Sequence, residues 1–168
     1  SEEWKLKISI EEKGVEKVER VYWIWRRHTC ESSKTSETMI QDFEILWKYA
    51  VSEWLSVDAF RSYYPKIHRK VDMVTFESVL IINEEAWKHL SNLHDDIIKW
   101  DYPEIKVFSL RYHGTYEFLS NAWMWVYMYL KPRKLRKSRK VPPYETYIND
   151  PMDTPNEDLI TDVSVPVK

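Results

Sequence analysis

Glycine is nearly absent from this chain. Only Gly14 and Gly114 occur among 168 residues, and each stands alone. Phosphate-binding loops and dinucleotide-binding fingerprints need several glycines at fixed spacing, because only glycine lets the backbone approach the phosphates closely enough. The nucleophile elbow of esterase-like enzymes needs paired glycines around its serine. The sequence therefore excludes all three of these sites.

The composition indicates a folded chain with a substantial core. Of the 168 residues, 43% are hydrophobic, and they include 9 Trp, 11 Tyr and 5 Phe, which sets the chain apart from disordered proteins. No apolar run reaches the ~18 residues of a membrane-spanning helix, and the first residues are too polar for a secretory signal. Cys30 is the single cysteine, which excludes an internal disulfide. We expect a cytoplasmic or nuclear protein.

The first half of the chain predicts a hairpin followed by a helix. Alternation over residues 4–10, with Trp4, Leu6 and Ile8 on one face, predicts a strand. An aromatic-rich second strand follows over residues 18–27. Apolar residues then recur at helical spacing, which predicts an amphipathic helix. These residues are Met39, Phe43, Leu46, Trp47, Ala50, Val51 and Trp54.

The second half predicts further strands and one short helix. Strand patterns cover residues 70–83 and 101–114, and Asn83 is placed to cap a helix after the first of them. Residues 123–130 are apolar in almost every position and are predicted as a strand rather than a helix. No internal repeat is visible.

The chain changes character after residue 130. Residues 131–140 carry seven positive charges and no negative ones, and residues 141–168 carry six acids against Lys168. Six of the eight prolines also lie in this part. We therefore predict a folded α+β domain over residues 1–130, with two to three helices on a small mixed or antiparallel sheet. Residues 131–168 are predicted to form an extended or disordered tail.

The candidate binding surface combines an aromatic strand face with the basic segment after it. If residues 123–130 form a strand, Trp123, Trp125, Tyr127 and Tyr129 share one face. Strand two offers a smaller aromatic patch beside Arg26 and Arg27. The basic residues next to the aromatic face are Lys131, Arg133, Lys134, Arg136, Lys137, Arg139 and Lys140.

Rings that stack bases beside cations that follow phosphates favour a non-enzymatic module that binds a polyanion, above all nucleic acid such as RNA. An anionic membrane surface would use the same side chains, and residues 133–140 also suit a nuclear import receptor. A second hypothesis is a self-associating viral matrix or structural protein. The alternative for the tryptophans themselves is a place in the core, because large aromatic rings dominate protein interiors.

The candidate catalytic and metal sites are weaker. Glu104 and Lys106 at the start of an apolar strand resemble the E-x-K element of the PD-(D/E)xK nuclease superfamily, with Asp72 as the second metal-holding acid that this resemblance implies. His89 and His94 are five residues apart, whereas zinc pairs on a helix stand three or four apart. The sequence therefore predicts no metal, no cofactor and no catalytic residue, and carries a metal-dependent nuclease as a minority alternative.

Overall fold

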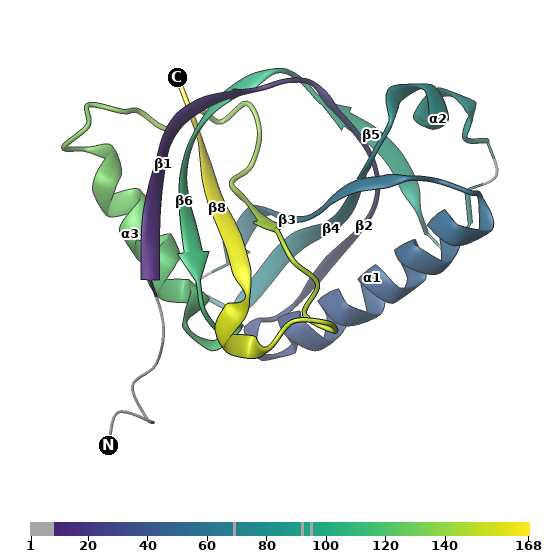
Figure 1. The fold of residues 1–168 in the computed structure, drawn as a ribbon, viewed down its shortest axis with the longest axis horizontal. Coiled ribbons are helices and arrows are strands. Elements are labelled where there is room, and N and C mark those ends of the chain that lie inside the picture. The colour runs from purple at the N-terminus through teal and green to yellow at the C-terminus, as the bar shows by residue number, and fades with distance from the viewer. Residues whose placement is uncertain (1–8, 69, 92, 95) are drawn as a thin grey trace. The chain divides into compact units, whose positions relative to one another are not determined.

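The computed structural model describes residues 9–68, 70–91, 93, 94 and 96–168, which form two compact units. Unit 1 contains residues up to Val18 and residues Ile105–Lys168, and unit 2 contains Glu19–Glu104. Figure 1 shows the ribbon of both units. Trp4, Leu6 and Ile8, which the sequence places in a first strand, lie outside the described residues.

Unit 2 is built on a strand–helix–strand–strand segment. Strand β2 (Val21–Glu31) leads through a short 3₁₀ turn (Ser32–Lys34) into helix α1 (Thr35–Ser52), and strands β3 (Val57–His68) and β4 (Met73–Ile82) follow. Helix α2 (Glu84–His89) and strand β5 (Ile98–Tyr102) complete the unit. The strand order is β3-β4-β2-β5, and every pairing in it is antiparallel.

Unit 1 repeats this arrangement without any visible sequence repeat. Strand β6 (Ile105–His113) is followed by a 3₁₀ turn (Tyr116–Phe118), helix α3 (Leu119–Leu130) and strand β7 (Tyr144–Tyr147). A 3₁₀ turn (Asn156–Asp158) precedes strand β8 (Ile160–Val167), and strand β1 (Ser9–Val18) supplies the outer edge. The order β7-β8-β6-β1 matches β3-β4-β2-β5 strand for strand.

The helix in each unit is required by the strand order. Strands β2 and β3 are both antiparallel to β4, which lies between them, so they run parallel to each other. Parallel strands cannot be joined by a tight turn and need a crossover, most often a helix. Helix α1 therefore packs on β2 and β4, and α3 packs on β6 and β8 in the same way.

Each unit buries its own apolar cluster between helix and sheet. In unit 1, Ala122 and Val126 of α3 are fully buried against Leu110 and Val163 of the sheet. In unit 2, Leu46 and Ala50 of α1 pack against strand residues such as Ile24 and Leu80. At roughly 1.5–3 kcal/mol for each large aliphatic side chain removed from water, these clusters are the main stabilising contribution to each unit.

Both units also place an arginine opposite an acid on the central strand pair. Arg27 of β2 lies across from Glu77 of β4, with 3.0 Å between the guanidinium and Glu77 Oε1. Arg111 of β6 lies across from Asp162 of β8 and binds it through two nitrogens, at 2.8 and 3.0 Å.

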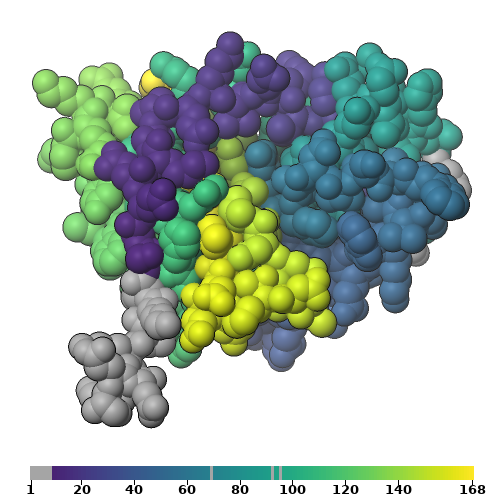
Figure 2. Space-filling model, in the orientation of Figure 1, coloured from purple at the N-terminus to yellow at the C-terminus, as the bar shows by residue number. Residues whose placement is uncertain are grey.

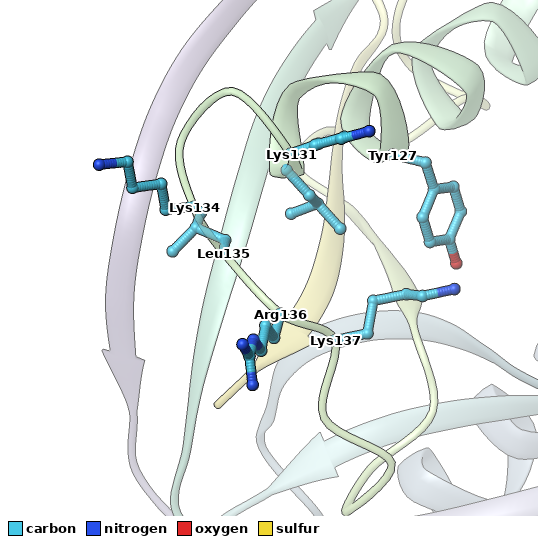
Figure 3. Close-up of a pocket in the computed structure, with 7 residues that line it drawn as sticks. Tyr127, Lys131, Lys134, Leu135, Arg136 and Lys137 are labelled. Carbon is cyan, nitrogen blue, oxygen red and sulfur yellow. The ribbon is translucent and has the colours of Figure 1, made fainter.

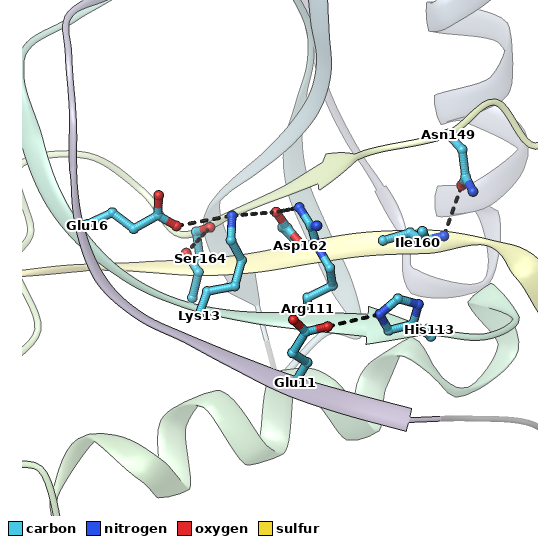
Figure 4. A network of polar contacts seen from close by, with 10 residues as sticks. Glu11, Lys13, Glu16, Arg111, His113, Asn149, Ile160, Asp162 and Ser164 are labelled. Carbon is cyan, nitrogen blue, oxygen red and sulfur yellow. Dashed lines mark hydrogen bonds and ion pairs between the residues drawn. The ribbon is translucent and has the colours of Figure 1, made fainter.

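In each unit, the outermost strand also contacts the acid of that unit's central strand pair through a side chain. In unit 1 it sends Lys13 to Asp162 at 3.1 Å (Figure 4). In unit 2 it sends the Tyr102 hydroxyl to Glu77 at 3.3 Å. The two acids therefore occupy equivalent places, one with two cationic partners and one with a cation and a phenol.

Several predicted elements are confirmed. The described residues form an α+β protein with three helices, and α1, α2 and β6 lie where the sequence predicts them. Asn83 caps α2, because its side-chain oxygen accepts from the backbone N–H groups of Glu85 and Ala86. With four antiparallel strands in each unit, however, the sheet structure is larger than the small sheet that was expected.

The prediction of a strand over residues 123–130 is wrong, because Leu119–Leu130 form helix α3. An almost unbroken apolar run fits either period, so the run itself carries no decisive signal. The helical signal lay in four residues spaced three and four apart, all buried in the structure: Leu119, Ala122, Val126 and Leu130. The four aromatic residues consequently do not form one strand face.

Two other expectations differ from the structure. Strand β1 pairs with β6, so it forms no hairpin with β2. The extended tail expected after residue 130 instead contains β7 and β8, and Val163, Val165 and Val167 are buried in the unit 1 core. Prolines and acids are frequent there and obscure a valine at every second position. The segment that carries these valines forms a strand by pairing with β6.

We predict that Arg27→Ala destabilises the protein in a pH-dependent way. Burial raises the pKa of Glu77, and the hydrogen bond and charge of Arg27 oppose that rise. Without Arg27 the buried carboxylate has lost its counter-charge, which costs about 2–3 kcal/mol of unfolding free energy at pH 8. Because a raised pKa in the folded state favours protonation there, this loss shrinks as the pH falls toward 5.

Urea unfolding of Arg27→Ala at pH 8 and pH 5 measures the effect. The same Arg27→Ala change made in a Glu77→Gln background serves as the control, since residue 77 then has no charge to compensate and the loss should be equal at both pH values. Equal destabilisation of Arg27→Ala at both pH values would contradict the assignment.

Candidate functional site

Strand β7 and helix α3 together hold a buried carboxylate at Glu145. Glu145 is 5% exposed. The indole nitrogen of Trp123 donates to its Oε1 at 2.6 Å, and the Tyr147 hydroxyl donates to its Oε2 at 2.6 Å. Alternation along the strand places Glu145 and Tyr147 on the same face, and Trp123 comes from the first half of α3. Both carboxylate oxygens therefore accept short hydrogen bonds from neutral donors.

Aromatic rings continue outward from this carboxylate in two directions. Tyr127 lies one helical turn after Trp123, and the two rings stack with centroids 6.2 Å apart. Tyr116 packs edge-to-face on Tyr147 at 5.8 Å. Burial, with the negative charge of Glu145 as a further cause, raises the pKa of Tyr116 to about 12. Tyr116 therefore presents a neutral phenol ring at physiological pH.

This arrangement is chemically suited to a cation with an apolar body. A carboxylate in a low-dielectric environment attracts positive charge more strongly than one in water. Ring faces add a cation–π contribution of about 0.5–2 kcal/mol each, depending on how far the cation is desolvated. The surrounding rings also bury apolar ligand surface. Glu145, Trp123, Tyr147, Tyr116 and Tyr127 are hereafter called the Glu145 site.

The equivalent position of unit 2 carries no such carboxylate. Counting from the matched acid–arginine pairs, Ser62 of β3 corresponds to Glu145, and Met39, the fifth residue of α1, corresponds to Trp123. The contact itself is preserved, since the Ser62 hydroxyl lies 3.1 Å from the Met39 sulfur. The two units thus share a side-chain contact at this place, but only unit 1 fills it with a charged group and an indole.

The sequence over residues 61–168 matches the family model of the GyrI-like small molecule binding domain. This match covers more than half of the chain. The chain belongs to the GyrI-like small-molecule-binding family. All five residues of the Glu145 site lie within the matched part.

Solved structures share this GyrI-like fold at low sequence identity. The C-terminal domain of EcmrR has a TM-score of 0.72 at 14% identity, covering 96% of this chain and 98% of that domain. A hydrolase of Listeria innocua encoded by lin2189 has a TM-score of 0.61 at 12% identity, covering 98% and 94%. SAV2435 bound to tetraphenylphosphonium has a TM-score of 0.57 at 15% identity, covering 94% of each chain. At such identities the likeness shows the fold alone.

The chain spans only part of a longer relative. It covers 58% of the EcmrR chain in the EcmrR–DNA complex, with a TM-score of 0.77. No curated protein sequence matches the chain.

The family corrects the predicted function. A binding module is confirmed, but the prediction of a nucleic-acid-binding, RNA-binding or viral matrix protein is wrong, because the family model that matches the chain describes a small-molecule-binding domain. The comparisons give no support to a membrane surface or an import receptor as partner. Within the described residues, no helix is both long and apolar enough to cross a membrane.

The predicted binding residues fall in three separate places. Trp123 and Tyr127 belong to the Glu145 site, whereas Trp125 and Tyr129 pack against the unit 1 core. Arg26 binds the buried Asp42 at 3.1 Å. Of the four aromatic residues, Trp123, Trp125 and Tyr129 are half-buried, and Tyr127 is exposed.

The predicted cations also divide. Arg27 pairs with Glu77 and lies over the Trp25 ring at 4.7 Å, and Arg133 binds Glu12 at 2.6 Å. These arginines are neutralised by the protein's own carboxylates. The other basic residues are exposed in the loop after α3, shown in light green in Figure 2: Lys131, Lys134, Arg136, Lys137, Arg139 and Lys140.

Sequence reasoning missed Glu145, Tyr147 and Tyr116. The available signal was the strand pattern of residues 144–147, which places Glu145 and Tyr147 on one face. The assignment of residues 131–168 to a tail hid this signal. Trp123 and Glu145 are 22 residues apart, and nothing local indicates that they meet.

The acids weighed for metal or nuclease chemistry lie in turns and connections of the fold. Asp72 lies in the turn before β4, where its backbone has a φ of 50°, and Glu104 lies between β5 and β6. Over the described part of the chain, no cluster of three or more His, Cys, Asp or Glu residues could hold a metal ion.

We predict that Trp123→Phe measurably lowers the free energy of unfolding, even though an aromatic ring remains at this position. The substitution removes one donor from a buried carboxylate, which should cost about 1.5–3 kcal/mol of unfolding free energy. Trp125→Phe is the matched control, because Trp125 packs on the same helix–sheet core. Urea unfolding should show the larger loss in Trp123→Phe, and equal losses would mean that the hydrogen bond to Glu145 adds nothing to stability.

Proposed function

We propose that this protein binds lipophilic aromatic cations at the Glu145 site. The observation that carries the proposal is the Glu145 carboxylate, 5% exposed and held by the Trp123 indole and the Tyr147 hydroxyl. Membership of a small-molecule-binding family supports a ligand of this size. A neighbour with the same fold, SAV2435, has been solved with tetraphenylphosphonium, which is a cation surrounded by four aromatic rings.

The aromatic residues set the shape of the accepted ligand. Trp123, Tyr127, Tyr116 and Tyr147 offer flat apolar faces, whereas a small hydrated cation would gain little from them. A delocalised charge on a bulky aromatic body loses little hydration on binding and can use both the rings and the carboxylate. Selectivity for charge comes from Glu145, and selectivity for bulk comes from the rings.

We further propose that the chain corresponds to the ligand-sensing part of a longer regulator. It matches almost the whole EcmrR C-terminal domain, but little more than half of the EcmrR chain that is bound to DNA. In this proposal DNA contact belongs to segments outside the matched part, and the Glu145 site supplies the signal.

A pair of ligands of equal shape and opposite charge tests the binding proposal. Tetraphenylphosphonium should bind by isothermal titration calorimetry, and tetraphenylborate should bind at least about tenfold more weakly, because Glu145 repels it. Glu145→Gln keeps the size of the side chain but removes its charge. We expect this variant to lose about 10–100-fold of the tetraphenylphosphonium affinity and most of the preference for the cation.

The control is Glu117→Gln, which removes an exposed acid from the same unit. It should bind both ligands like the wild type. If Glu145→Gln bound tetraphenylphosphonium as tightly as the wild type, with its fold intact by circular dichroism, Glu145 would not be the counter-charge and the proposal would fall.

A further inference from the structure

The loop after α3 concentrates positive charge that the cation site does not use. Residues 131–140 are hereafter called the basic loop. Arg133 is paired with Glu12, but across the described residues the other six cations of the loop form no ion pair within 4 Å. All six are exposed. Like charges this close repel one another, so the loop is electrostatically unfavourable without a negative partner.

The helix end accounts for only part of this charge. The C-terminus of α3 carries a partial negative charge, which favours a cation in the last turn or directly after it. Lys131 stands at that position. Arg136, Lys137 and Arg139 lie further along the chain, beyond the short range of the helix dipole. Their placement needs another explanation.

The basic loop surrounds two adjoining hollows. The first has a volume of about 620 Å³, within the usual range for small-molecule sites. Its lining combines the Tyr127 ring with four cations and two leucines (Figure 3): Tyr127, Leu130, Lys131, Lys134, Leu135, Arg136 and Lys137. The second, of about 610 Å³, is lined by Arg136, Lys137, Arg139 and Lys168. Arg136 and Lys137 line both.

The backbone of the loop is fixed to the sheet rather than free. The Ser138 N–H donates to the Pro166 carbonyl at 2.9 Å, and the Lys168 N–H donates to the Arg136 carbonyl at 2.9 Å. Lys137 also forms a β-bridge with Val167. Arg136 and Lys137 are therefore presented from a backbone already ordered before any ligand arrives, which lowers the entropic cost of binding.

An aromatic wall stands beside these cations. Lys137 Nζ lies 5.2 Å from the centre of the Tyr127 ring, and Figure 3 shows its side chain extending toward that ring. The ammonium of Lys134 points away on the other side of the loop. Leu130 and Leu135 add apolar surface to the same hollow. The hollow thus offers a place for an aromatic ring directly next to Arg136 and Lys137.

We infer that the basic loop is a second ligand site, which binds a small aromatic phosphate ester. The phosphate lies at Arg136 and Lys137, where the two hollows meet, and the ring lies against Tyr127 and Leu135. Arginine suits this place because its planar group can bind two phosphate oxygens at once. The site does not use the Glu145 carboxylate, although it shares the Tyr127 ring with the Glu145 site, and it takes ligands of the opposite charge.

Titration calorimetry with three probes tests the chemistry. We expect 1-naphthyl phosphate to bind, with 1-naphthol and inorganic phosphate each at least about tenfold weaker, since one lacks the charge and the other lacks the ring. Raising the salt from 50 to 500 mM should weaken the binding of 1-naphthyl phosphate, because the loop is exposed and screened by ions. Equal binding of 1-naphthol would remove the role of the cations. A short DNA duplex that bound while 1-naphthyl phosphate did not would overturn the proposal.

Paired variants test the location. Arg136→Ala/Lys137→Ala should lose at least about 30-fold of the affinity for 1-naphthyl phosphate. Lys34→Ala/Lys48→Ala removes the same charge from exposed positions of unit 2 and should bind like the wild type. The loop variant should keep its affinity for tetraphenylphosphonium, and Glu145→Gln should keep its affinity for 1-naphthyl phosphate. Unchanged 1-naphthyl phosphate binding in the loop variant would refute the site, whatever happens at Glu145.

Discussion

Each unit of this protein depends on one central strand pair, β2 with β4 in unit 2 and β6 with β8 in unit 1. The remaining strands add at the two edges of that pair, and the crossover helix packs across it. The arginine and the acid that face each other on the pair favour its register, because a slip of one residue would place them on opposite faces of the sheet. A lysine or a tyrosine from the outermost strand then ties that strand to the same acid.

The two units share a fold but differ at the place of the Glu145 carboxylate. The contact between the fifth residue of the helix and the strand that follows it, β3 or β7, exists in both units. Methionine and serine make it uncharged in unit 2, whereas tryptophan and glutamate make it charged in unit 1. Unit 2 instead buries charge elsewhere, with Asp42 held by Arg26, His28 and Ser78. Burial raises the pKa of Asp42, and these neighbours oppose that rise.

Helix α3 connects the two proposed sites of unit 1. Trp123 faces the Glu145 carboxylate, and one turn later Tyr127 stacks on Trp123 and lies under the Lys137 ammonium. A negative centre and a positive centre thus lie on either side of one pair of stacked rings. Hydrogen-bonded backbone carries both proposed sites, since Glu145 stands on β7 where it pairs with β8, and the Arg136 carbonyl accepts from the Lys168 N–H.

The sequence by itself determined the features that depend on neighbouring residues. The α+β class, the amphipathic helix α1, the Asn83 cap and the exposure of the cations in residues 131–140 follow from local spacing and charge. The near absence of glycine likewise excluded glycine-dependent phosphate loops. Local chemistry acts over a few residues, so a single sequence is enough to predict these features.

Only the tertiary structure decided which distant residues meet. Residues 119–130 became a helix because Ala122 and Val126 could pack on β6 and β8, and that packing placed Trp123 against Glu145. The valines of β8 became a central strand because β6 offered antiparallel partners. Arg27, predicted to bind a ligand, instead donates to Glu77, which lies 50 residues away in the sequence. Contacts of this kind are selected by the free energy of the whole fold, and no local pattern encodes them.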